Sequence, residues 1–173
     1  MTSSACTQSE DGTRAEPQTT PAASPSEVRA AAEASELVIS GQVLYVPIYS
    51  SIFYRDAQRT LELAAMLSIH NTDRYHSITI TQADYHGISG KLLKSYMNEK
   101  RVLKPLETLN IVIEERDASG GTGANFIVSW TAVEEVTEPI VEALMVSTRS
   151  SSGISFTTQA KVLEDLSNSN MGD

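Results

Sequence analysis

The sequence has little cysteine, little positive charge and no long apolar run. Cys6 is the only cysteine among 173 residues, which excludes a disulfide within the chain and any zinc site that needs two thiolates. The 13 Lys and Arg residues are outnumbered by 22 Asp and Glu, and a net charge of −9 repels nucleic-acid phosphates and anionic lipids. No apolar run reaches the roughly 18 residues of a membrane-spanning helix. We therefore expect no nucleic-acid partner.

The first part of the chain also lacks large apolar side chains. Residues 7–27 read TQSEDGTRAEPQTTPAASPSE, a composition that cannot bury enough surface to offset its ordering entropy. We predict a disordered tether over residues 1–36, with a short helix starting near Glu27 because alanine and glutamate favour helix. The folded domain is expected over residues 37–163, and residues 164–173 are expected to fray.

After Ile39 apolar residues recur at every second position between turn residues, a pattern typical of strands with one buried face. We predict an all-β fold, an antiparallel β-sandwich of immunoglobulin-like type, with a closed barrel as the alternative. Pro47 lacks an amide hydrogen, so its strand is expected at a sheet edge or with a bulge. The predicted strands are Gln42–Tyr49, Thr60–Asn71, Ser77–Tyr85, Lys91–Met97, Leu109–Glu115, Asn125–Ala132, Pro139–Thr148 and Ile154–Val162.

A glycine-rich loop, SGGTGANF, precedes one of these strands. A dinucleotide-binding loop needs a third glycine where Phe126 stands, and a helix rather than a strand after it. The favoured interpretation is a turn between two strands, in which glycine supplies the backbone freedom. The alternative is a nest of amides, or a cation held by carboxylates and loop carbonyls. The candidate ligand-binding residues are Glu115, Asp117, Ser119, Gly120, Gly121, Gly123 and Asn125.

The histidines offer a second kind of chemistry. His70 and His76 flank a turn-like NTDRY stretch, and His86 follows Asp84 closely. A metal-dependent or hydrolytic enzyme that uses His70, His76 and Asp84 requires these side chains to converge. Histidines at turns and strand ends are more often solvated, so we predict no metal, no cofactor and no catalytic residue.

Several stretches of the chain, taken in the order in which they occur, resemble a bacterial family of domains of unknown function, number 3124. The resemblance extends from about Gly41 to Lys161 and implies an exported protein, often made with a lipoprotein signal. It implies no activity. The matching stretches are LYVPIYSSI, LSIHNTD, SITITQADYHGISGKLLKSY, LKPLET, SGGTGANFIVSW and GISFTTQA.

Cys6 follows Ser3-Ser4-Ala5, and small residues precede the acylated cysteine of bacterial lipoproteins. The aliphatic residue expected where Ser3 stands is missing, as are the charged start and apolar core of a signal peptide, so an ordinary free cysteine is the alternative. We expect Met1–Ala5 to be a signal remnant and Cys6 a lipidation site, which gives the only membrane contact. The expected location is the periplasm or cell envelope.

From these features we predict a non-enzymatic module that binds an envelope protein or a small ligand. Its binding surface is expected at the end that carries the glycine-rich loop, near Tyr49, Ser50 and Thr148. Connecting loops carried by a rigid β scaffold are where binding residues concentrate.

Overall fold

The computed structural model describes residues 38–147 and 153–167. The predicted tether, its helix, Cys6 and Thr148 lie outside the described residues. Within the described ranges no helix is long and apolar enough to cross a membrane.

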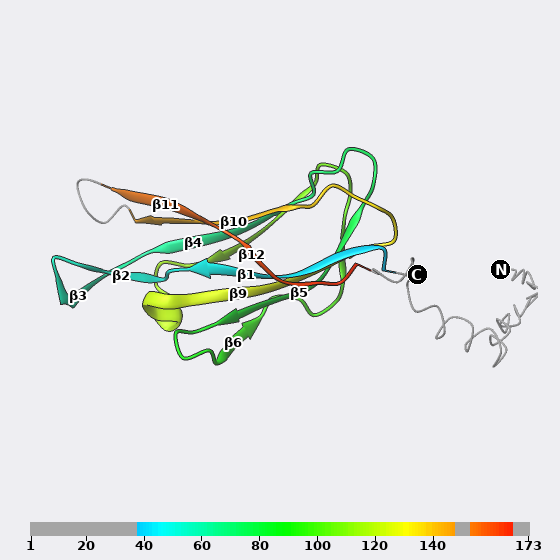
Figure 1. Ribbon diagram of the computed structural model, residues 1–173. Coiled ribbons are helices and arrows are strands. Elements are labelled where there is room, and N and C mark those ends of the chain that lie inside the picture. The colour runs from blue at the N-terminus through cyan, green and yellow to red at the C-terminus, as the bar shows by residue number, and fades with distance from the viewer. Residues whose placement is uncertain (1–37, 148–152, 168–173) are drawn as a thin grey trace, which may run out of the picture. The chain divides into compact units, whose positions relative to one another are not determined.

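The described chain forms two main antiparallel sheets and one separate hairpin (Figure 1). The six-stranded sheet has the order β12-β1-β9-β5-β6, with β7 also beside β5, and the four-stranded sheet has the order β11-β10-β4-β8. Strands β2 and β3 pair with each other. The elements are β1 (Ser40–Ile48), β2 (Ser51–Tyr54), β3 (Asp56–Glu62), β4 (Ala64–His70), β5 (Ile78–His86), β6 (Leu92–Ser95), β7 (Arg101–Leu103), β8 (Thr108–Ile113), the 3-10 helix η1 (Ala118–Gly123), β9 (Ala124–Ala132), β10 (Ile140–Ser147), β11 (Ile154–Gln159) and β12 (Lys161–Asp165).

One apolar core lies between the two sheets, and it is built by the predicted alternation. Phe126, Val128 and Trp130 on β9 are buried, as are Leu67 and Ile69 on β4 of the opposite sheet. Burial of each such side chain stabilises the fold by about 1.5–3 kcal/mol. The prediction of an all-β chain with antiparallel sheets is confirmed, and neither sheet closes into a barrel.

A bulge in β5 changes which residues face the core. Ile78 and Ile80 are buried, and the pairing with β9 then shifts register between Ile80 and Gln82. After the shift the buried residues are Ala83 and Tyr85, three and five positions beyond Ile80. The extra residue lets the strand keep an apolar inner face although the strict alternation is broken.

Two predicted strands are each divided in the structure. The prediction of one strand over residues 60–71 is wrong, because β3 ends before Leu63 and β4 begins after it. The predicted strand over residues 154–162 is likewise split at Ala160. At each break the chain moves between sheets: the Leu63 N–H donates to the Ser50 carbonyl at 2.9 Å, and the Ala160 N–H donates to the Val141 carbonyl at 3.0 Å. Alternation continues through both breaks, so the pattern does not reveal them.

Pro47 lies on an inner strand rather than an edge strand. Strand β1 pairs with β9 along its whole length, and Pro47 is opposite Asn125. On its other side β1 pairs with β12 only from Gln42 to Tyr45, with a register shift between Val43 and Leu44. The missing amide hydrogen of Pro47 therefore falls beyond the end of the β12 pairing, where no ladder hydrogen bond is lost.

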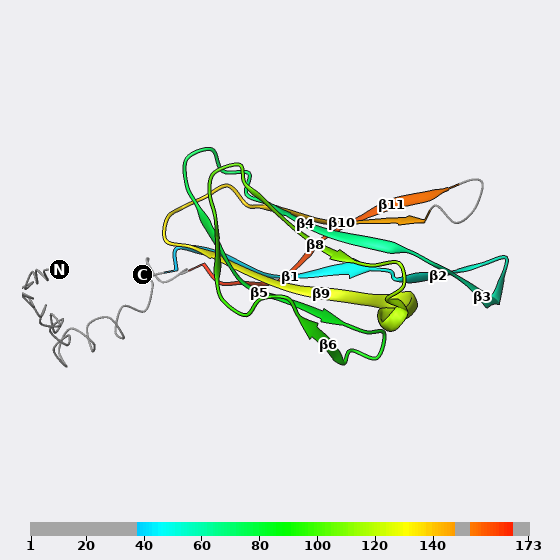
Figure 2. The same ribbon diagram turned by 180° about the vertical axis from the view of Figure 1, so that it is seen from behind.

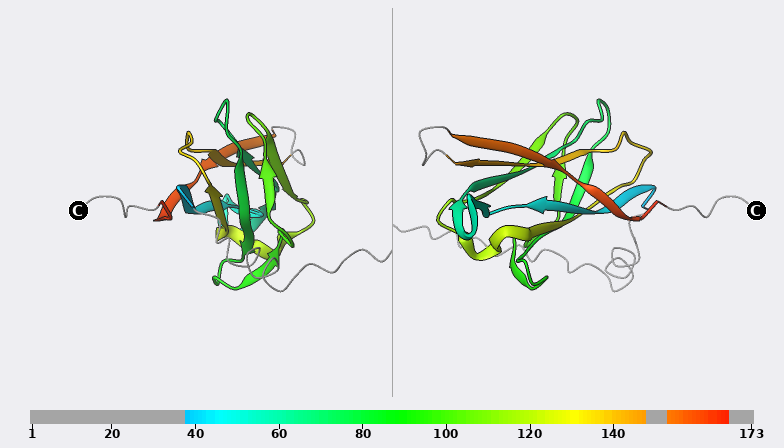
Figure 3. Two further views of the ribbon diagram at one scale, coloured as in Figure 1. Left: turned by 90° about the vertical axis from the view of Figure 1, so that its right-hand side faces the viewer. Right: turned by 60° about the vertical axis from the view of Figure 1, so that its left-hand side comes forward.

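The two ends of the paired sheets carry different connections. Figures 1 and 2 show the β2–β3 hairpin, the end of β10 that lies beside the start of β11, and η1 at one end, with the hairpin extending beyond the sheets. The additional views in Figure 3 show the long loops at the other end, where Ile39 and Ser167 also lie. These loops are residues 71–77, 104–107 and 133–139.

Asp73 joins two of these loops through backbone hydrogen bonds. Its Oδ1 accepts the N–H groups of Tyr75 and His76, both at 2.8 Å, and its Oδ2 accepts the N–H of Thr137 at 3.0 Å. The Thr137 bond, followed by those from Tyr75 and His76, holds the pKa of Asp73 well below its ordinary value. Asp73 therefore stays ionised and fixes the loop over residues 133–139.

Asn71 connects the third loop, residues 104–107, to the two loops that Asp73 joins. We call residues 71–73 the hub. Its Nδ2 donates to the carbonyls of His76, Leu103 and Lys104 at 2.9, 3.2 and 3.0 Å, and its Oδ1 accepts the Asp73 N–H at 3.0 Å. Asn71 is almost fully buried. The short NTD stretch, which the sequence presents as a turn between two histidines, is thus the junction of three loops.

Candidate functional site

The glycine-rich loop forms η1 and is shaped by packing. A Cβ added to Gly120 would lie 1.9 Å from the Tyr85 hydroxyl oxygen and 2.7 Å from the Ala124 Cβ. Gly121 has a φ of 73°, in the left-handed region that favours glycine. Two of the three glycines are therefore explained by the close approach of Tyr85 and by the turn itself.

Two carbonyls and one carboxylate of this loop accept hydrogen bonds from the protein. The Gly120 and Gly121 carbonyls accept hydrogen bonds from the Ile88 N–H at 3.1 Å and the Ser50 hydroxyl at 3.2 Å. Asp117 accepts from the N–H and the hydroxyl of Ser119. These bonds favour the interpretation as a turn, and Ser50 lies beside the loop as expected.

The other two residues of the predicted ligand set point to different partners. Glu115 accepts a hydrogen bond from the Ser147 hydroxyl at 3.2 Å. Asn125 belongs to β9, where it is paired with Pro47 and His86. The role of the whole set in ligand binding stays a prediction.

The histidines are distributed over both sheets and a loop. His70 contacts Thr108 Oγ1 at 2.9 Å in the four-stranded sheet, while His76 Nε2 lies 2.9 Å from Glu134 Oε2. Asp84, on the six-stranded sheet, accepts from Gln82 at 2.7 Å. No group of three His, Cys, Asp or Glu suited to a metal ion exists among the described residues. The enzyme alternative stays a prediction that this arrangement does not favour.

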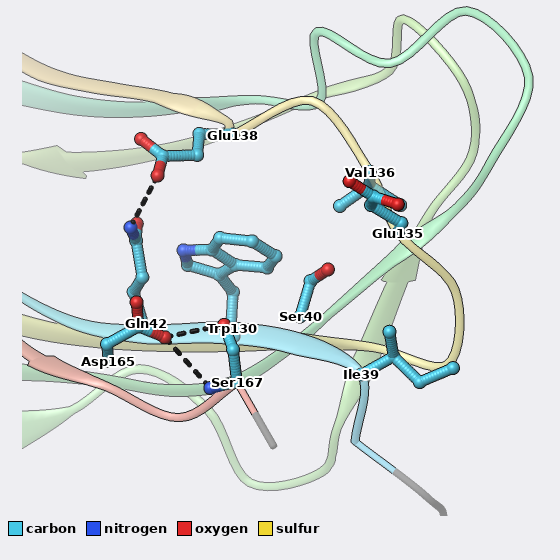
Figure 4. A pocket seen from close by; sticks show the side chains of 10 residues that line it. Ile39, Ser40, Gln42, Trp130, Glu135, Val136, Glu138, Asp165 and Ser167 are labelled. Atoms are coloured by element: carbon cyan, nitrogen blue, oxygen red, sulfur yellow. Dashed lines mark hydrogen bonds between the residues drawn. The ribbon is translucent and has the colours of Figure 1, made fainter. Parts of the chain in front are cut away.

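A cavity of about 320 Å³ lies at the opposite end, beside the hub (Figure 4). Strands β1 and β9 form one wall, the loop over residues 133–139 forms another, and the end of β12 forms a third. The cavity is lined by Ile39, Ser40, Gly41, Gln42, Trp130, Glu135, Val136, Glu138, Asp165 and Ser167.

The strand register places the two central polar groups of the cavity together. Gln42 on β1 is directly opposite Trp130 on β9. Gln42 Nε2 donates to Glu138 Oε1 at 2.9 Å, and the Glu138 carbonyl accepts from the Thr72 hydroxyl at 2.7 Å. Thr72 belongs to the same NTD stretch as Asp73, so the hub also fixes Glu138.

Trp130 contributes a buried donor to the cavity wall. The residue is 1% exposed, and no described residue accepts a hydrogen bond from its Nε1–H. Figure 4 shows the ring nitrogen facing the side of the cavity where Gln42 and Glu138 lie. A buried N–H without an acceptor costs about 1–3 kcal/mol, so an acceptor from a ligand would recover that energy.

The cavity is acidic. Its lining includes Glu135, Glu138 and Asp165, and no Lys, Arg or His is among the lining residues. The hydroxyl and then the N–H of Ser167 donate to Asp165 and lower its pKa below the ordinary value, so this carboxylate is ionised at neutral pH. The electrostatic field inside the cavity therefore favours a positively charged molecule.

A second cavity of about 210 Å³ adjoins the first. Both are lined by Gln42 and Glu138, so the hydrogen bond between these side chains lies at their common boundary. Leu44, Ile140 and Val162 are among the apolar residues that line the second cavity.

Sequence reasoning missed this site, although two signals were present. Gln42 occupies the inward register of Leu44, Val46 and Ile48, where an apolar residue is expected. Trp130 lies in the strand predicted over residues 125–132, and a buried indole N–H needs an acceptor. A polar side chain in an inward position needs a hydrogen-bond partner, so Gln42 indicates a polar environment on the inner face of its strand.

Comparisons with known proteins give a family and a distant structural likeness. A family model described as "Protein of unknown function (DUF3124)" matches residues 41–163. No curated protein matches the chain. The crystal structure of Thermotoga maritima 1070 is similar with a TM-score of 0.41 and 11% identity, covering 69% of this chain and 92% of that one.

Replacement of Gly120 by alanine is expected to destabilise the protein by about 1–3 kcal/mol, because the new Cβ overpacks against Tyr85. Gly123→Ala is the matched control: its Cβ would meet Ile88 at 3.4 Å, an ordinary contact, and the change is expected to stay within about 1 kcal/mol. Urea unfolding followed by tryptophan fluorescence measures both. Equal effects of the two substitutions would show that packing against Tyr85 does not explain Gly120.

Proposed function

The chain belongs to the DUF3124 family, and we propose that it is a non-enzymatic binding module that holds a small polar ligand in the cavity around Trp130. The observation that carries the proposal is the buried indole N–H, which faces the cavity and has no acceptor among the described residues. A cavity of about 320 Å³ is within the usual size of small-molecule sites.

The construction of the walls supports binding by a preformed site. Two walls are strands of the six-stranded sheet, and the third is a loop that Asp73 and Thr72 fix through Thr137 and Glu138. A ligand entering such a site does not have to order the protein around it, so less of its interaction energy is lost. The few polar groups then determine orientation and specificity.

We also propose that the module acts outside the cytoplasm, tethered through an acylated Cys6, and that its sheets are a variant of the immunoglobulin-like sandwich. The small residues before Cys6, the polar tether and the family resemblance support the first part. Mass spectrometry of the Cys6-containing peptide, from protein expressed in its native host from the native gene, tests it: an acyl group on Cys6 is expected, and an unmodified thiol contradicts it.

Ligand binding is measurable without a label, because Trp130 is the only tryptophan in the chain. We expect at least one class among small amines, sugars, carboxylic acids and nucleosides to shift the emission of Trp130 in a saturable way. Gln42→Ala should weaken this binding because it removes the hydrogen bond to Glu138. Gln82→Ala, a glutamine of β5 outside the cavity lining, is the matched control. Failure of every class to shift the emission would contradict the proposal.

A further inference from the structure

We propose that the Trp130 cavity recognises a small amino alcohol, that is, a protonated amine with a hydroxyl oxygen a few bonds away. This inference rests on the proposed function and adds the chemical class of the ligand. It follows from the charge of the cavity, from the kind of hydrogen-bonding group on its wall, and from how the carboxylates are distributed.

The charge of the lining selects a cation. Glu135 and Glu138 come from the loop, Asp165 comes from the end of β12, and the lining contains no basic residue. Figure 4 shows Glu138 and Glu135 on the loop side of the indole and Asp165 on the opposite side. The net charge of −9 adds to this field, which repels carboxylates and phosphates and attracts amines.

The distribution of the carboxylates favours an organic cation over a metal ion. No three acidic or histidine side chains of the described residues converge on one point in the way a metal requires. An ammonium group has three N–H donors on a small centre and pairs well with one or two carboxylate oxygens. Glu138 is held in place by Gln42 at 2.9 Å and is therefore a fixed partner for such a group.

The indole N–H favours a ligand that also carries an oxygen. Protonated amines, including polyamines, have only donors, so they leave the Nε1–H of Trp130 without an acceptor. A hydroxyl group accepts from Nε1 and still donates to a carboxylate. The pairing of an acidic lining with one fixed, buried donor therefore points to an amine and a hydroxyl carried by one molecule.

Three small compounds of nearly equal size separate the contribution of the amine from that of the hydroxyl group. Ethanolamine carries both groups, propylamine replaces the hydroxyl by a methyl group, and propan-1-ol replaces the amine by a methyl group. We expect ethanolamine to bind about threefold to tenfold more tightly than propylamine and at least about tenfold more tightly than propan-1-ol. Calorimetry, together with the emission of Trp130, measures the three affinities on the unaltered protein.

Variants of the cavity residues test which side chain causes the preference for an amine and which causes the preference for a hydroxyl group. Glu135→Gln and Glu138→Gln should each lower the ethanolamine affinity by about threefold to tenfold, while Glu164→Gln, an equal change of charge on β12 outside the cavity lining, should not. Trp130→Phe should bring ethanolamine and propylamine to equal affinity in calorimetry. If this variant does not fold, the comparison of the three probes on the unaltered protein decides the same point.

Ethanolamine binding no tighter than either analogue overturns the inference, as does an effect of Glu164→Gln equal to that of Glu135→Gln. If ethanolamine fails while a sugar or a carboxylic acid shifts the emission of Trp130, the ligand class is wrong and the proposed function stands. If no compound class shifts the emission, both are wrong.

Discussion

The hydrogen bonds to the ionised carboxylate of Asp73 determine how the loops at one end of this protein are held together. It accepts three backbone N–H groups, two from its own loop and one from Thr137, which is 64 residues away in the sequence. Asn71 adds hydrogen bonds to a third loop, and Thr72 bonds to the Glu138 carbonyl. Charge-assisted bonds such as those to Asp73 are stronger than neutral ones, so Asp73 is expected to contribute most among the three consecutive residues that connect these loops.

The cavity around Trp130 is a consequence of this junction. The loop that Asp73 fixes carries Glu135 and Glu138, and the paired strands β1 and β9 present Gln42 and Trp130 to it. The opposite end is organised differently, since the glycine-rich loop packs against Tyr85 and Ile88 and uses its own carbonyls in hydrogen bonds. The unusual composition of that loop reflects packing, and at the cavity the buried Nε1–H of Trp130 has no acceptor among the described residues.

The alternation of apolar residues was sufficient to predict the sheets and most of the core, because each inward side chain follows from the period of a strand. It was not sufficient at Leu63 and Ala160, where the chain changes sheets without interrupting the pattern. The junction at Asp73 could not be predicted, since its partner Thr137 is distant in sequence and offers only a backbone N–H. The site was visible in part, as a glutamine in the inward register of β1.

Acid unfolding of Asp73→Asn tests the central role of this carboxylate most directly, with Trp130 emission as the readout. A folded pKa below the ordinary 3.8 means that the stabilisation is complete above pH 3.8 and declines as pH falls toward the folded pKa. The unaltered protein should therefore exceed Asp73→Asn in unfolding free energy by a constant amount near neutral pH, and the difference should shrink below pH 3.8. Asp56→Asn, at an exposed carboxylate of β3, should change little. A difference between the unaltered protein and Asp73→Asn that is absent, or that does not vary with pH, would contradict the account.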